Sequence, residues 1–184
     1  MIKSEKEKML AGNFYDASDE ELTKERDYAR NLTFEFNHTR PSEKDKRQEI
    51  LKQLIIAKGS FHIEAPFNCD YGYNIEIGEN FYANYGCTIL DVNKVKIGDN
   101  VLLAPNVQIY TATHPIDPIE RLSGKEYAKP IAIGNNVWIG GGAIICPGVK
   151  IGDNVTIGAG SVVTKDIPDN VIAAGNPCRV IKGI

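Results

Sequence analysis

The pattern of apolar and polar positions changes near residue 60 and divides the chain into two parts. Before residue 60, apolar residues recur at helical spacing among many charged ones, as Ile50, Leu51, Leu54 and Ile55 do on one predicted helical face. After residue 60 the spacing of apolar residues becomes regular at a different period. We therefore predict an amino-terminal helical segment over 1–60 and a separate repetitive unit over 61–184.

Three helices are expected in the first segment. One is short and lies near the amino terminus. Ser18, followed three residues later by Glu21, predicts a capping box that opens the second helix, which runs to about Phe36. The third is predicted over 42–58 with Gly59 as its stop.

In the second part an aliphatic residue returns at every sixth position. The clearest run, and an earlier run in the same phase, comprise Ile133, Ile139, Ile145, Ile151, Ile157 and Val163, and Ile97, Leu103 and Ile109. A small or apolar residue follows four positions after each, with Thr113 as the exception. A looser set begins at Ile77.

A period of six fits neither an α-helix nor a plain alternating strand, and indicates one short strand and one turn per repeat. Three such units would close a triangular coil of 18 residues, and successive coils would stack through parallel ladder hydrogen bonds. The Gly-Asp-Asn and Gly-Asn-Asn runs at 98–100, 134–136 and 152–154 would then form corners that need positive φ. A parallel α/β sheet is the alternative, but no helix-length amphipathic stretch separates the repeats.

The repeat is interrupted once at length, between Tyr110 and Pro130, by a polar excursion with His114 near its start. Long excursions from a compact repeat are commonly functional. A histidine can accept a hydroxyl proton at neutral pH and release it later. His114 is therefore the candidate general base, whereas His38 and His62 are expected to be structural or exposed to solvent.

Charge and composition narrow the class of partner. The chain has 21 Lys and Arg against 24 Asp and Glu, a net charge of -3, which offers no broad attraction for nucleic acid or an anionic membrane. The four scattered cysteines are expected to be reduced thiols, and neither a signal peptide nor an 18-residue apolar run is present. We expect a cytoplasmic protein.

Several segments together carry a family resemblance that covers nearly the whole chain. They are residues 9–16, 34–38, 81–84 and 104–107, the His114-Pro115 loop, and residues 133–140 and 174–179. On these motifs the chain resembles the hexapeptide-repeat acetyltransferases of the maltose and galactoside O-acetyltransferase branch. The resemblance implies a left-handed parallel β-helix with an amino-terminal helical segment and a protruding loop, associated as a homotrimer with active sites between neighbouring chains.

The resemblance also implies the reaction. An acetyl group passes from acetyl-CoA, a co-substrate and not a permanently bound cofactor, directly to a hydroxyl of a small sugar of the maltose, glucose or galactoside type. His114 would take the hydroxyl proton, and a backbone N–H near Gly141 would stabilise the tetrahedral oxyanion. No covalent enzyme intermediate and no metal are expected.

Binding residues follow from the same resemblance. The predicted acceptor-binding residues are Asp16, Asp70, Asn84 and Asp91. The predicted acetyl-CoA-binding residues are Trp138, Gly141, Gly142, Ala159 and Gly160 along the pantetheine arm, and Thr164, Lys165, Arg179 and Lys182 near the phosphates and adenine. Asp70 stands where a relative has serine, and Val92 follows Asp91 where a second aspartate can occur, so the acceptor is left open.

Other functions fit parts of the pattern. A zinc-dependent lyase similar to γ-type carbonic anhydrase would need three convergent histidines. A non-catalytic binding β-helix would leave the His114 excursion and the basic carboxyl-terminal residues unexplained. Within the acetyltransferases, the acceptor hydroxyl could belong to serine, an antibiotic or a lipo-oligosaccharide.

Overall fold

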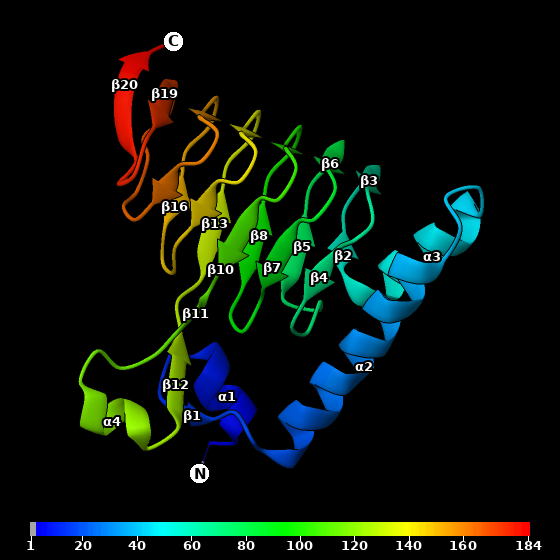
Figure 1. The fold of residues 1–184 in the computed structure, drawn as a ribbon, viewed down its shortest axis with the longest axis vertical. Coiled ribbons are helices and arrows are strands. Elements are labelled where there is room, and N and C mark those ends of the chain that lie inside the picture. Colours follow the sequence, from blue (N-terminus) through cyan, green and yellow to red (C-terminus); the bar gives the residue numbers. More distant parts are fainter. Residues whose placement is uncertain (1–2) are drawn as a thin grey trace.

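The computed structural model describes residues 3–184 as a parallel β-helix with helices at one end and an antiparallel hairpin at the other (Figure 1). Each coil contributes one short strand to each of three faces. The first face comprises β2 (Ile56–Ala57), β5 (Ile75–Ile77), β8 (Val95–Ile97), β13 (Ile131–Ile133) and β16 (Lys150–Ile151). The second comprises β3 (Phe61–Ile63), β6 (Phe81–Ala83), β9 (Leu102–Leu103), β14 (Trp138–Ile139), β17 (Thr156–Ile157), β19 (Val171–Ala174) and β20 (Arg179–Gly183). The third comprises β4 (Asn68–Cys69), β7 (Thr88–Leu90), β10 (Gln108–Tyr110), β15 (Ile144–Ile145) and β18 (Val162–Val163).

The six-residue period predicted from the sequence is the period of the core. Ile133, Ile139 and Ile145 lie on three successive faces and are all buried, and Ile97 pairs with Ile133 in the parallel ladder of the first face. Because each coil repeats the same inward positions, the buried aliphatic side chains stack into one continuous core.

The corners between the first and second faces are built by asparagines. Asn100, Asn136 and Asn154 have φ of 56°, in the left-handed region that asparagine tolerates better than most residues. Their side-chain amides also hydrogen-bond from coil to coil, in a ladder that starts at Asn80 and ends at Asn170. The predicted corner chemistry is confirmed at all three predicted runs.

Three helices precede the solenoid: α1 (Glu5–Leu10), α2 (Glu20–His38) and α3 (Lys44–Leu54). Helix α2 is capped by the Asp19 carboxylate, which accepts from the N–H groups of Glu21 and Leu22. The predicted capping box at Ser18 is wrong, because the Ser18 hydroxyl donates to Asp16 instead. The sequence does have a capping box, but it lies at Ser4 and Glu7 of α1.

The prediction of a helix to residue 58 is also wrong at its end. Helix α3 stops at Leu54, and Ile56 already pairs with Glu76 in the first face. The buried residues of α2 and α3 share one core with the first coils, so these helices cover the amino-terminal end of the solenoid. None of the helices within residues 3–184 is long and apolar enough to cross a membrane.

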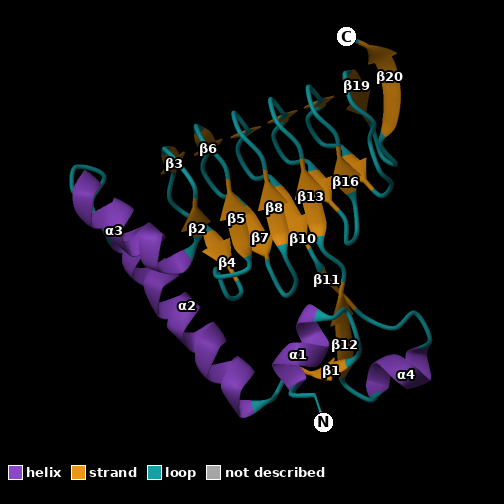
Figure 2. Ribbon diagram, turned by 180° about the vertical axis from the view of Figure 1, so that it is seen from behind, coloured by secondary structure: helices purple, strands orange, loops and turns teal. Residues whose placement is uncertain are grey.

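The excursion at 110–130 is a folded arm. It contains β11 (Ala112–Thr113), α4 (Pro118–Leu122) and β12 (Lys125–Ala128), and β12 pairs antiparallel with both β11 and β1 (Tyr15–Asp16). Figure 2 shows this arm projecting beyond the solenoid beside α1. A small second core joins the arm base to α1, to the start of α2 and to the neighbouring corner.

Candidate active site

His114 stands at the end of strand β11 on the arm, with its side chain exposed. The pairing of Thr113 with Tyr127 fixes the backbone immediately before it. Pro115 behind it is buried, and the Arg121 guanidinium donates to the carbonyls of Pro115 and Ile116 at 3.2 and 3.1 Å. Within residues 3–184 the His114 ring makes no hydrogen bond, so both ring nitrogens are available to a ligand.

The corner between the third and first faces holds Asp70 and Asp91, and the arm leaves the solenoid from the same corner. Asp91 is fully buried. Its carboxylate accepts from the N–H groups of Asp70, Tyr71 and Asn74 at 3.0, 2.9 and 3.2 Å. Burial raises the pKa of Asp91 to about 7, against the opposing effect of these N–H donors.

The burial of Asp91 limits how its side chain can take part in binding an acceptor. Its oxygens are used by the backbone and have no exposed surface, so the side chain does not reach an acceptor in this arrangement. It instead fixes the loop that carries Asp70. The acceptor-binding role predicted for Asp91 stays a prediction; the bonds seen here are those of a residue that positions the Asp70 loop.

Asp70 itself is partly exposed and lies among charged groups. Burial raises the pKa of its carboxyl, while the positive charges of Arg26 and Arg30 oppose the rise. Arg26 is held in place by hydrogen bonds to the Tyr71 hydroxyl at 2.7 Å and to the Ala17 carbonyl. Asp70 is therefore a carboxylate on a rigid support with one accessible side.

Asp16 comes to the same region through strand pairing. It pairs with Lys125 of the arm and, with Ser18, Ser123 and Gly124, lines a groove between the amino-terminal segment and the arm. The Ser18 hydroxyl and N–H both donate to its carboxylate, which lowers the pKa of Asp16. Because Asp16 is exposed, its remaining oxygen surface faces solvent.

Sequence reasoning missed three residues of this region: Tyr15, Arg26 and Glu126. The Tyr15 hydroxyl donates to the Glu126 carboxylate at 2.9 Å across the β1–β12 pair. Arg26 is brought to Asp70 by α2. A register count could have found Glu126, because a hairpin that pairs Thr113 with Tyr127 sets Glu126 opposite His114. Nothing in the local sequence marks Arg26.

The remaining predicted acceptor-binding residue and the predicted pantetheine contacts lie at another corner, between the second and third faces. Asn84 is there, with its side-chain oxygen accepting from the Tyr85 N–H. So are the predicted pantetheine contacts, Gly141, Gly142, Ala159 and Gly160. Gly142 and Gly160 have φ of 67° and 68°, and a Cβ on either would meet nothing within 4 Å, so this edge is open. The Gly141 N–H donates no hydrogen bond within residues 3–184, which leaves it free to bind an oxyanion.

Trp138 belongs to the second face, 53% exposed, above Leu102 in the parallel ladder. Arg179 and Lys182 lie on β20 at the far edge of this face. Thr164 and Lys165, however, follow β18 and lie at the third-to-first corner. All four polar residues are exposed and belong to the carboxyl-terminal end of the solenoid.

The candidate base and the glycine-lined groove thus lie on opposite edges of the third face, while Thr164 and Lys165 share the edge of His114. His114, Asp16, Asp70 and Asp91 are at one edge, and Asn84 and the glycine-lined groove are at the other. Strand β10 and its flanking residues separate the edges by roughly 13 Å at 3.3 Å per residue. Direct acetyl transfer needs the base, the acceptor and the thioester within about 3 to 3.5 Å of one another.

The three histidines do not converge within the described chain. His38 is the last residue of α2, His62 lies on β3 beside Glu64, and His114 is on the arm. Among residues 3–184 no group of three or more His, Cys, Asp or Glu side chains is placed to hold a metal ion.

Comparison with known proteins identifies the family. The family model for the maltose acetyltransferase hexapeptide capping motif matches residues 8–59, and the model for the bacterial transferase hexapeptide, with six repeats, matches residues 130–165. The galactoside O-acetyltransferase of Escherichia coli strain K12 is 50% identical over 179 residues, 97% of this chain and 88% of that enzyme. This chain belongs to the hexapeptide-repeat acetyltransferases of the galactoside and maltose type.

Solved structures of this family superpose on the whole chain. The maltose O-acetyltransferase from Clostridium difficile 630 is 62% identical with a TM-score of 0.97, covering 99% of this chain and 98% of that one. A galactoside acetyltransferase in complex with coenzyme A is 48% identical with a TM-score of 0.96, covering 100% of this chain and 92% of that one. The predicted family, fold class and enzyme class are confirmed: the hexapeptide-repeat protein is an acyltransferase, which sets aside the non-catalytic scaffold.

Proposed function

We propose that this acyltransferase moves the acetyl group of acetyl-CoA to a hydroxyl of a small sugar of the maltose, glucose or galactoside type. The observation that carries the proposal is the exposed His114 at the base of the arm, together with Asp16, which pairs with the arm, and Asp70, which lies at the corner where the arm leaves the solenoid. Carboxylates suit a sugar because each accepts from more than one hydroxyl. The named sugar O-acetyltransferases among its relatives support the same acceptor class.

In the proposed mechanism His114 accepts the proton of the acceptor hydroxyl as its oxygen attacks the thioester carbonyl carbon. The carbonyl oxygen becomes an oxyanion, which the unpaired N–H of Gly141 stabilises. Collapse of this intermediate breaks the carbon–sulfur bond, and the departing thiolate takes the proton from His114. No covalent bond to the enzyme forms.

Because the two groups of site residues lie on opposite edges of the third face, we propose that each active site combines the arm of one chain with the groove of a neighbour in a homotrimer. A closed ring with threefold symmetry joins unlike surfaces in this head-to-tail manner. The arm also exposes three large aliphatic side chains, Ile116, Ile119 and Leu122, at 92%, 81% and 86%. A neighbouring chain would bury such a patch.

We propose the acetyl-CoA contacts from the positions of the predicted residues on the solenoid. The pantetheine part of acetyl-CoA would lie along the open edge at Gly142, Ala159 and Gly160, beside Trp138. Its phosphates would reach Thr164, Lys165, Arg179 and Lys182. The cytoplasmic location of the protein stays a prediction. A hydroxyl of serine or of an antibiotic remains the alternative acceptor.

The proposal is tested by an acceptor screen that follows thiol release from acetyl-CoA. We expect turnover with a sugar acceptor, and a loss of about 10²-fold or more in kcat for His114→Ala, because a general base contributes that much. His38→Ala is the matched control and should keep full activity, since the His38 ring hydrogen-bonds the Phe34 carbonyl and packs on the Phe34 ring at the end of α2, away from the arm. Turnover of His114→Ala within about tenfold of wild type would rule out the base assignment.

A further inference from the structure

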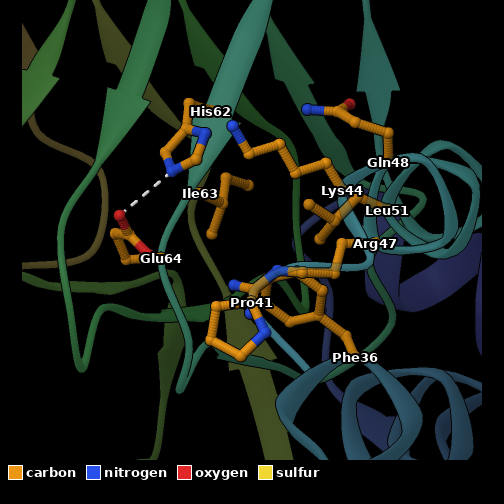
Figure 3. A pocket seen from close by; sticks show the side chains of 9 residues that line it. All are labelled: Phe36, Pro41, Lys44, Arg47, Gln48, Leu51, His62, Ile63 and Glu64. Atoms are coloured by element: carbon orange, nitrogen blue, oxygen red, sulfur yellow. Dashed lines mark ion pairs between the residues drawn. The ribbon is translucent and has the colours of Figure 1, made fainter. Parts of the chain in front are cut away.

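A pocket lies between helices α2 and α3 and strand β3 at the amino-terminal end of the solenoid, one coil away from Asn84. We call it the basal pocket; Figure 3 shows its lining, and its volume is about 490 Å³. The lining residues are Phe36, Pro41, Lys44, Arg47, Gln48, Leu51, His62, Ile63 and Glu64. None of them belongs to the proposed active site.

Arg47 is the unusual member of this pocket. Its side chain comes from the buried face of α3 and is only 8% exposed. The guanidinium lies 4.6 Å from the Phe36 ring centre, and its Nη1 donates one long bond, 3.4 Å, to the Thr39 carbonyl. Its Nη2 is buried and has no hydrogen-bond partner among residues 3–184. A buried guanidinium with one long bond and one unpartnered nitrogen is costly, so an anion that reached this nitrogen would be stabilised.

Two further positive features face the same space. Lys44 extends across the pocket toward His62 in Figure 3, and within the described residues no carboxylate lies within 4 Å of its Nζ. Lys44 is also the first residue of α3, whose N-cap Glu43 makes no side-chain capping bond. The first-turn N–H groups of this 11-residue helix therefore receive no bond from the N-cap side chain, and the carboxylate of Asp45 in the same turn opposes part of their positive charge.

The other lining residues define the rest of the ligand. Glu64 carries the opposing charge, and its Oε1 lies 3.1 Å from His62 Nε2, a contact that compensates this charge only when His62 is protonated. The amide of Gln48 already donates to the Phe61 carbonyl. Phe36, Leu51 and Ile63 provide an apolar floor. The pocket therefore combines an anion-binding corner with room for an apolar group.

We propose that the basal pocket is a second ligand site for a phosphate monoester with an apolar substituent. A phosphate offers three oxygens to the guanidinium of Arg47, the ammonium of Lys44 and the start of α3, whereas a carboxylate offers two. The site is separate from acetyl-CoA binding, since the predicted phosphate contacts of acetyl-CoA lie at the carboxyl-terminal coils.

Calorimetric titration of the full-length protein tests this at constant ionic strength, with phenyl phosphate, inorganic phosphate and benzoate as probes. We expect saturable binding of one phenyl phosphate per chain, and weaker binding of the other two. Absence of saturable phenyl phosphate binding overturns the site. Benzoate binding as tight as that of phenyl phosphate overturns the phosphate assignment.

Variants locate the binding. Lys44→Gln should weaken phenyl phosphate binding about tenfold, because it removes one charge-assisted hydrogen bond. Lys44 is exposed, so this variant should fold even if Arg47→Gln does not. Lys52→Gln, on the same helix but outside the pocket, and Lys165→Gln, at the predicted acetyl-CoA phosphate contact, should bind as wild type does. Equal weakening by Lys52→Gln would indicate general electrostatics, and loss with Lys165→Gln alone would place the phosphate in the acetyl-CoA site; either result overturns the proposal.

Discussion

At the scale of single residues, the candidate acceptor edge shows two aspartates with different tasks. Asp91 is buried and bonded to the backbone, whereas Asp70, held on the loop that Asp91 fixes, keeps one side exposed. The sequence places both side chains at a corner but does not distinguish the supporting one from the accessible one. That distinction depends on burial, which comes from the packing of α1, α2 and the arm around the corner.

Asp70 is expected to set affinity for the acceptor. Replacing it with serine removes a carboxylate that could accept from two hydroxyls, so we expect the KM for the sugar to rise about tenfold. The kcat should change by less than about threefold, and the KM for acetyl-CoA should not change. Steady-state kinetics measure all three. A change confined to kcat would argue that Asp70 acts in the chemical step.

Asp91 should make stability depend on pH. Its pKa is about 7 in the folded chain against 3.8 in the unfolded chain, so folding favours the protonated form. Its contribution to the free energy of unfolding is then present at low pH, declines as the pH rises above the pKa of the unfolded chain, and levels off above the pKa of the folded chain. The difference between these two pKa values corresponds to roughly 4 kcal/mol at most in the free energy of unfolding.

Urea unfolding at pH 5 and pH 8 measures this dependence. Wild type should lose more of its free energy of unfolding over that range than Asp91→Asn. The variant is expected to be less stable than wild type at pH 5, by about 1 to 3 kcal/mol, because one amide oxygen replaces two acceptors. An identical change with pH in the two proteins would show that Asp91 does not titrate in this range.

At the scale of elements, the period of six predicted the solenoid because every coil repeats the same inward positions. Ile133, Ile139 and Ile145 are each buried on a different face, as the spacing requires. The helix boundaries were less accurate. Ser18 and Asp19 are both good capping residues, and only the pairing of Asp16 with the arm decides that Ser18 bonds backward. Likewise Ile55 fits a helical face, but α3 ends at Leu54 because Ile56 pairs with Glu76 in the parallel ladder of the first face.

The corrected cap of α2 can be checked directly. Asp19→Ala should lower the free energy of unfolding by about 0.5 to 2 kcal/mol, since two first-turn N–H groups lose their acceptor. Ser18→Ala is the matched control one residue away and should cost less, because its hydroxyl makes no bond to the helix. Chemical denaturation of both variants measures the difference. A larger cost for Ser18→Ala would restore the capping box predicted from the sequence.

At the scale of the whole molecule, the family, the fold and the existence of an excursion from the repeat could be predicted, while the separation of the predicted site residues onto two edges could not. His114 and Gly141 both stand out in the sequence as candidates for one reaction. Only the order of strands shows that a complete third-face strand lies between them. Spacing along the chain reports the coil to which a residue belongs, and it does not report which chain completes its site.

Mixing two inactive variants tests the proposed sharing. His114→Ala disables the arm of its chain, and Ala159→Trp fills the groove of its chain at an exposed position. If sites form between neighbours, an equal mixture that exchanges subunits has one functional arm facing one functional groove in about one quarter of sites. Activity should therefore recover to about a quarter of wild type. A mixture that stays inactive after confirmed subunit exchange would place the whole site in one chain.

The asparagine ladder repeats the same corner in successive coils, so the coils are evenly spaced along the solenoid axis. Strands β10 and β18 are two ladder steps apart. The coil from which the arm begins and the coil that carries Lys165 are therefore separated by roughly 10 Å along the solenoid axis. Duplicating an 18-residue coil between them would preserve every corner contact and the core, yet move the predicted phosphate contacts one step further from His114. The number of coils therefore sets the axial distance between His114 and the predicted phosphate contacts.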